Sequence, residues 1–189
     1  MAIAELGKAK IYKSRDELDK AEQAILVAIQ YFKKYQKIYP EDYQGFLALG
    51  DIFLNEAQEK RQAAIEAQKV GRTEDADKLQ LESKNLANAA LEELQQAFRF
   101  LPLNMQVLNS LGKAYMETGQ CSKAEEFFRK ALDIEEKNDI ALFNSGLNYL
   151  ECFNKPDRAR EVFLNLLKIK PDDPRALFYL KQIDSGTLP

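Results

Sequence analysis

The chain has 189 residues and a formal net charge of −3, with both signs mixed along its length, so the basic face that nucleic-acid binding usually requires is not expected. Histidine is absent, which excludes Ser/His/Asp and Cys/His catalytic triads and every histidine-ligated metal site. With 8 Gly and 6 Pro, the composition favours long helices with short connections over a β-sandwich or barrel, which needs more turns.

Residues 1–40 are predicted to be helical. Ser14 and Glu17 have the spacing of a capping box, which predicts that a long helix begins there. Apolar residues follow along one face of that helix at spacings of three and four, and Pro40 ends it. The segment is interpreted as a degenerate repeat of the hairpins that follow, with an N-terminal helical capping pair as the alternative.

Residues 43–104 are predicted to form two long helices joined at Val70-Gly71-Arg72, with Gly71 at a helix C-terminus and Thr73 as an N-cap. The segment is about 28 residues longer than a 34-residue helix hairpin. Shared between the two helices, this excess is about 14 residues, or two heptads, per helix. An elongated hairpin arm over residues 57–86 is therefore expected, either as a contact surface or as a tolerated insertion. Its apolar seam is assigned to Ala57, Ala64, Ala67, Leu79, Leu86 and Ala90.

Residues 105–138 and 139–173 repeat one another. When they are aligned on Gly112 and Gly146, both copies have apolar residues at spacings of three and four, interrupted by a turn, which predicts helix, turn, helix. The two glycines are expected where the helices of a hairpin cross closely, because a larger side chain would push them apart. Residues 174–185 are predicted to be a C-terminal capping helix whose inward side chains are Leu177, Leu180 and Ile183.

The 34-residue period of 105–138 carries a characteristic series of residues: Leu111-Gly112, Tyr115, Ala124, Phe128 and Ala131. This series resembles the tetratricopeptide repeat, and the resemblance extends over residues 105–185. It implies an all-α fold, an α-solenoid of antiparallel helix hairpins, to which the 43–104 segment adds a long coiled-coil-like arm. It also implies a non-catalytic protein–protein interaction scaffold, and neither a cofactor nor a metal is expected.

The resemblance implies that ligands contact the first helix of each hairpin, between its packing positions, on the concave surface. Carried over to this sequence, the expected partner-binding residues are Leu47, Asp51, Leu54, Asn55, Asn109, Lys113, Met116, Ile140, Phe143, Leu147 and Leu150. The helix predicted over 139–153 is apolar nearly all round, and such a helix is buried or binds a partner. Two interpretations stay open: the chain or a second copy covers this apolar strip, or a helix or extended segment of another protein occupies it.

Some tetratricopeptide domains bind the acidic C-terminus of heat-shock chaperones through a clamp of Lys, Asn and Arg side chains. Neither alignment of this sequence to that clamp supplies the full set, so this function is not expected. The expected partner is a peptide or amphipathic helix of another protein. The alternatives are an assembly or secretion chaperone that shields an apolar client segment, and a self-assembling structural protein that forms homo-oligomers.

Cys121 and Cys152 are interpreted as buried thiols, with a redox pair as the alternative. No stretch approaches the ~18 consecutive apolar residues of a transmembrane helix, so no membrane span is expected. The first residues lack the charged and apolar regions of a signal peptide. A cytoplasmic location is therefore expected, and a periplasmic or exported one stays open if a signal segment was removed.

Overall fold

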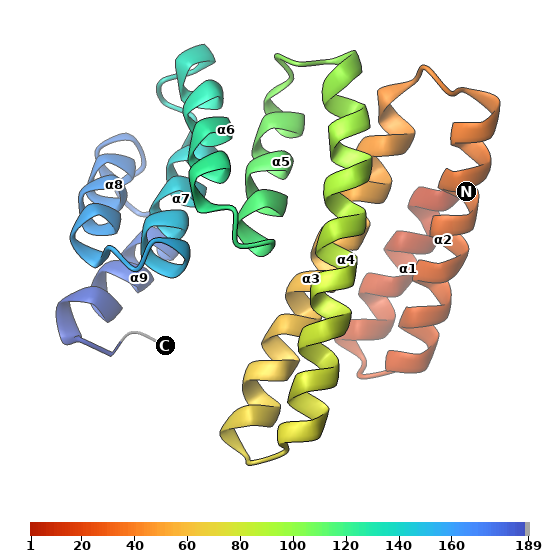
Figure 1. Ribbon diagram of the computed structural model, residues 1–189, viewed down its shortest axis with the longest axis horizontal. Helices are drawn as coiled ribbons and strands as arrows, with labels where there is room; N and C mark the ends of the chain where they lie inside the picture. The colour runs from red at the N-terminus through yellow and green to blue at the C-terminus, as the bar shows by residue number, and fades with distance from the viewer. Residues whose placement is uncertain (188–189) are drawn as a thin grey trace. The chain divides into compact units, whose positions relative to one another are not determined.

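The computed structural model describes residues 1–187, and every regular element in that range is a helix (Figure 1). The chain divides into two compact units, one of residues 1–101 and one that begins at Pro102. Within each unit, antiparallel helix hairpins pack against one another in chain order. This arrangement confirms the predicted all-α class of stacked hairpins.

The first unit consists of two hairpins. One pairs α1 (Ala2–Ser14) with α2 (Leu18–Ile38), and the other pairs α3 (Tyr43–Lys69) with α4 (Thr73–Phe100). Gly45 lets α2 and α3 approach closely, since a Cβ at that position would lie 2.9 Å from Cγ of Gln36. The core between α1, α2 and α3 is built on Ala9, Ala24, Ile25 and Ile52.

The turn between α1 and α2 differs from the capping-box prediction. Ser14 is the last residue of α1, and its hydroxyl donates a hydrogen bond to the carbonyl of Ile11 at 2.8 Å. Glu17 is the N-cap of α2 and makes no side-chain capping bond. Asp16, with φ of 58°, occupies the left-handed region and reverses the chain between them. The predicted helix start at Ser14 is therefore wrong, because a tight turn occupies that site.

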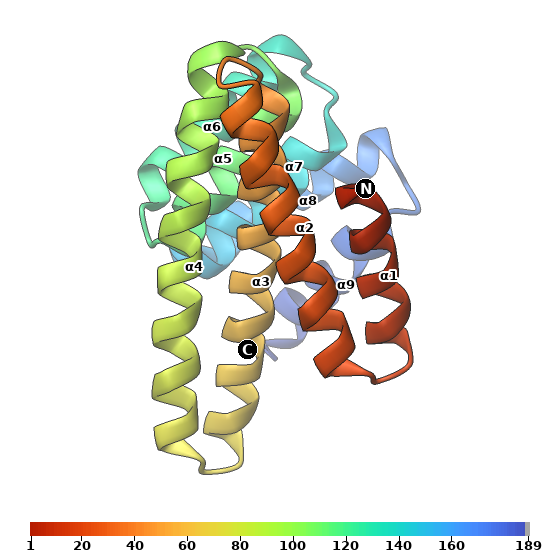
Figure 2. The same ribbon diagram turned by 90° about the vertical axis from the view of Figure 1, so that its right-hand side faces the viewer.

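The second hairpin is the predicted arm. Its helices contain 27 and 28 residues, against 13 and 14 in the next hairpin, so each is 14 residues longer, as expected. The arm extends beyond the turn that joins α1 and α2 (Figures 1 and 2). At its tip, Gly71 has a φ of 78°, which suits glycine. The N-cap prediction for Thr73 is wrong, since Arg72 is the N-cap and Thr73 the first helical residue.

Small side chains hold the arm together. Ala57, Ala64, Ala67 and Ala90 are buried as predicted, and the Ser83 hydroxyl donates to the carbonyl of Ala57 at 2.7 Å. Leu79 and Leu86, the other two candidates for the seam, are half-buried and so less deeply placed than these alanines. Close packing of two helices favours small side chains on the facing surfaces, so the seam positions on α4 are taken by Ala76, Ser83, Ala87 and Ala90.

The second unit stacks two hairpins and a final helix. Its elements are α5 (Met105–Glu117), α6 (Cys121–Ile134), α7 (Asp139–Leu147), the π-helical turn η1 (Asn148–Cys152), α8 (Pro156–Ile169) and α9 (Pro174–Ser185). A Cβ at Gly112 would overlap the ring of Phe128, and one at Gly146 would overlap Phe163, with Cζ 2.8 Å away in both cases. The two hairpins therefore cross in the same way, as their repeated glycines indicate.

The inward face of α9 differs from the prediction. Leu180 is buried, but Leu177 is 48% exposed and Phe178 is 55% exposed. Asp173 caps the helix through the amides of Arg175 and Ala176, and this start places Ala176 rather than Leu177 against the core. The inward assignment of Leu177 is therefore wrong.

Candidate partner-binding face

The first helices of successive hairpins in the second unit begin at similar caps. The side chain of Asn104 accepts from the amide of Val107 at 3.1 Å, and Asn138 accepts from Ala141 at 2.8 Å. Each cap satisfies one of the free amides at a helix N-terminus and so sets where the helix starts. Helices α5 and α7 are in direct contact. Residues three or four positions apart lie on the same side of a helix, so the corresponding residues of α5 and α7 form a common face.

Four of the expected partner-binding residues are buried: Leu47, Leu54, Asn109 and Leu150. Leu54, for example, is 1% exposed. Leu47, Leu54 and Leu150 contribute to packing, and Asn109 is the one polar side chain among the four. Sequence periodicity identified their helices but not the depth of each side chain.

The remaining expected residues are more accessible. Asn55 and Ile140 are exposed, whereas Asp51, Lys113, Met116, Phe143 and Leu147 are half-buried. Asp51 and Asn55 belong to α3 in the first unit. The face described here therefore consists of second-unit residues alone, on α5 and α7.

The predicted apolar strip, which runs along α7 into η1, is largely covered by the chain itself. The ring of Phe143 packs against Phe163 on α8 and Tyr179 on α9, with ring centroids 5.8 and 5.9 Å apart. Leu150 is part of the same core cluster, and Leu147 packs against it. Only Ile140 remains exposed, so the strip is narrower than the sequence indicated.

A charged group borders this face at the start of α9. The Arg175 guanidinium lies 4.5 Å from the centroid of the Phe143 ring and pairs with Asp139 at 3.3 Å and with Asp173 at 2.7 Å. Its hydrogen bond holds the pKa of the buried Asp173 carboxyl well below the usual range. The result is a fixed cation beside an aromatic ring.

Two buried amide atoms on adjacent helices have no hydrogen-bond partner among residues 1–187. They are Oδ1 of Asn109 on α5 and Nδ2 of Asn144 on α7. Buried polar atoms in folded proteins are nearly always paired, so each such atom calls for an explanation. Together the two atoms provide one acceptor and one donor. Asn144 was not among the expected partner-binding residues. The signal that could have identified it is its position one helical turn after Ile140.

The two cysteines are not the buried thiols that the sequence suggested. Cys121 and Cys152 form a disulfide, with Cα atoms 5.6 Å apart, and both residues are half-buried. The neighbouring Asn148 donates to the carbonyl of Cys121 and to the carboxylate of Glu125, each at 3.1 Å. Ser145 also donates to Glu125, at 2.9 Å. The signal that could have revealed the bond is the position of one cysteine at a helix start and the other at a helix end in the next hairpin.

Within the described part of the chain, no helix is both long enough and apolar enough to cross a membrane. In the same residues, no cluster of Cys, Asp and Glu side chains could hold a metal ion.

Residues 106–138 match the family model described as "Tetratricopeptide repeat". No curated protein matches the sequence. Among solved structures, a crystal structure of MamA is similar, with 20% identity, a TM-score of 0.62, and coverage of 89% of this chain and 81% of that chain. A structure of Pseudomonas aeruginosa PilF has 20% identity and a TM-score of 0.56, over 98% of this chain and 68% of that chain. Likenesses at this level of identity show the fold alone.

Proposed function

Because this chain is a tetratricopeptide-repeat protein, with one repeat matched over residues 106–138, we propose that it is a non-catalytic scaffold that binds an extended peptide of another protein. Proteins of this repeat class generally mediate protein–protein interactions. The proposed binding surface, called the partner face below, consists of residues on α5 and α7: Asn109, Lys113, Met116, Ile140, Asn144 and Leu147.

The observation that carries this proposal is the pair of unpartnered amide atoms on Asn109 and Asn144. An extended main chain has amide donors and carbonyl acceptors available along its length. A peptide could donate to Oδ1 of Asn109 and accept from Nδ2 of Asn144. Each buried polar atom without a partner destabilises by about 1–3 kcal/mol, and pairing with a ligand would remove that penalty.

The surrounding side chains indicate the composition of the peptide. Met116 and Leu147 are half-buried apolar groups, and Ile140 is exposed. Lys113 adds a positive charge on α5. A peptide with an acidic residue and one or two apolar residues would complement this surface, because opposite charges steer association and apolar contact supplies affinity.

Selection of random displayed peptides on the oxidised protein tests the proposal. The selected peptide is expected to bind at least tenfold more weakly to the double variant Asn109→Ala, Asn144→Ala. The control is Asn165→Ala, an exposed asparagine on α8, which should leave binding unchanged. Circular dichroism checks that the double variant is folded. Undiminished affinity in that variant would overturn the proposal.

The exposed pair Leu177 and Phe178 on α9 favours a second candidate, self-association. Contiguous exposed apolar surface marks interaction sites in many proteins. Light scattering over a tenfold concentration range should then give a mass above that of the monomer, and Phe178→Glu should restore the monomer. A constant monomer mass would eliminate this candidate. The shielding-chaperone alternative is not favoured, because Phe143 and Leu150 already pack within the chain.

We also propose that the protein works in an oxidising compartment, in place of the expected cytoplasmic location. The support is the Cys121–Cys152 disulfide, a bond that forms and persists mainly outside reducing compartments. Alkylation of the protein directly from its native source tests this, with mass spectrometry as the readout. Two alkylated cysteines before reduction would contradict it.

A further inference from the structure

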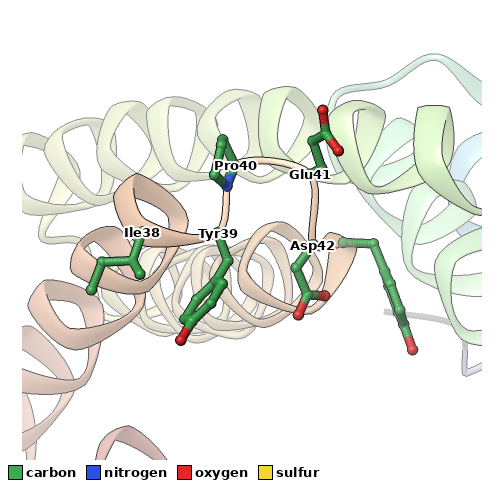
Figure 3. A pocket seen from close by; sticks show the side chains of 6 residues that line it. Ile38, Tyr39, Pro40, Glu41 and Asp42 are labelled. Carbon is green, nitrogen blue, oxygen red and sulfur yellow. The ribbon is translucent and has the colours of Figure 1, made fainter.

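The connection between α2 and α3 forms an open pocket of about 520 Å³ in the first unit, and its lining shares no residue with the partner face. It is lined by Ile38, Tyr39, Pro40, Glu41, Asp42 and Tyr43. Figure 3 shows that the Tyr39 ring and the Asp42 carboxylate point to the same side of the connection, whereas Glu41 points to the opposite side. An aromatic ring and a carboxylate therefore share one concave surface.

The Asp42 carboxylate is held in place from two directions. Its Oδ1 accepts a hydrogen bond from the backbone amide of Gln44 at 2.9 Å, and this bond caps α3. Its Oδ2 accepts a hydrogen bond from the hydroxyl of Tyr35. The hydrogen bond from Tyr35, followed by that from Gln44, lowers the pKa of Asp42. A carboxylate has about four lone-pair sites, so two more hydrogen bonds can be accepted.

The aromatic part of the pocket is preorganised as well. The rings of Tyr35 and Tyr39 lie with centroids 4.9 Å apart and planes at 44°. Tyr39 is nevertheless 54% exposed, and the adjacent Ile38 is exposed too. Ring faces carry partial negative charge and attract cations. The surface thus combines exposed apolar area, a ring face and a fixed anion.

We propose that this pocket binds an arginine side chain of a protein partner, with the guanidinium against Asp42 and the aliphatic stem along Tyr39 and Ile38. Arginine suits the site better than lysine, because its planar guanidinium donates two parallel hydrogen bonds to a carboxylate and also stacks on aromatic rings. The N-terminus of α3 carries about half a positive charge and offsets part of the charge of Asp42. Binding of a single arginine is therefore weak.

An NMR titration of the intact oxidised protein tests the site with N-acetyl-arginine amide as the probe. The neutral isostere N-acetyl-citrulline amide serves as the control ligand. The arginine probe should shift the amides of residues 38–44 in a saturable manner, and the citrulline probe should not. Equal shifts with both probes, or shifts spread over the acidic residues of the whole chain, would overturn the proposal.

Two substitutions locate the contacts. Asp42→Asn preserves an N-cap side chain and should weaken binding of the arginine probe at least tenfold. Tyr39→Ala should weaken it severalfold, whereas Phe178→Ala, at a ring of similar exposure on α9, should have no effect. Unchanged affinity in Asp42→Asn would refute the site. If that variant misfolds, the comparison of the two probes on the unaltered protein decides the matter. The partner face lies on other helices, so either proposal can fail without the other.

Discussion

Cys121, the first residue of α6, is bonded to Cys152, the last residue of η1, and this disulfide joins the two hairpins of the second unit covalently. The π-helical turn ends at this bond, and its first residue, Asn148, is fully buried and donates a hydrogen bond to the carbonyl of Cys121 at 3.1 Å. The disulfide and this neighbouring hydrogen bond therefore both join the start of α6 to the segment that follows α7.

Reduction of this disulfide is expected to destabilise the protein. The two cysteines are separated by 31 positions in the sequence, and a loop of this size corresponds to about 3–4 kcal/mol of stabilisation in the chain-entropy treatment. The urea midpoint of the second unit, followed by a probe on α7, should fall when a reductant is added. The double variant Cys121→Ser, Cys152→Ser should have the lower midpoint in both conditions. Equal midpoints for the oxidised and reduced protein would contradict this expectation.

Substitution of Gly112 by alanine should lower stability by about 1–3 kcal/mol, because the new Cβ would overlap the ring of Phe128 in a packed core. Gly7→Ala is the matched control within a helix. A Cβ at Gly7 has no neighbour within 4 Å, so this change should raise stability by about 0.5–1 kcal/mol. Thermal and urea denaturation measure both. A neutral effect of Gly112→Ala would show that the Phe128 ring can move aside.

The stability contributed by Asp173 should depend on pH. Its hydrogen bond from Arg175 lowers the pKa in the folded state below the ordinary value of 3.8. A group with a lowered folded-state pKa stabilises above its unfolded-state pKa, and this contribution is lost as the pH falls through the folded-state pKa. The urea midpoint of the unaltered protein should exceed that of Asp173→Asn at pH 6.

This difference in midpoint should shrink as the pH is lowered below about 4, where the carboxyl begins to be protonated in the unfolded chain. Asn at position 173 preserves a capping side chain, so the comparison isolates the charge. A difference that is constant from pH 6 to pH 3 would show that Asp173 acts through its cap alone.

Removal of residues 58–84, replaced by a short turn, should leave the first unit folded. The core of that unit, built on Ala9, Ala24, Ile25 and Ile52, lies outside the deleted segment. The deletion does remove Glu59, which pairs with Lys13 at 2.6 Å, but exposed ion pairs contribute about 0–1 kcal/mol. Circular dichroism should show a loss of helix equal to the deleted residues. A larger loss would mean that the arm is part of the core.

Several features of the fold could be predicted because they depend on local or periodic patterns. The elongated arm followed from a count of residues between Tyr43 and Asn104, and the structure gives the same excess of 14 residues in each helix. The crossing points at Gly112 and Gly146 followed from their equivalent places in two copies of one repeat. The candidate site was predicted less well, since half-buried positions such as Met116 and fully buried ones such as Leu54 share the same spacing.

The sequence by itself determined the all-α class, the hairpins of the second unit, the arm and the helices on which the proposed partner face lies, because helix periodicity and glycine positions are properties of neighbouring residues. Only the tertiary structure decided that Cys121 meets Cys152, that Tyr179 of α9 covers Phe143, and that Leu177 is exposed. Each of these depends on which face of a helix lies against a helix from another hairpin. That choice is set by the sum of packing contacts between hairpins, and no short stretch of sequence contains it.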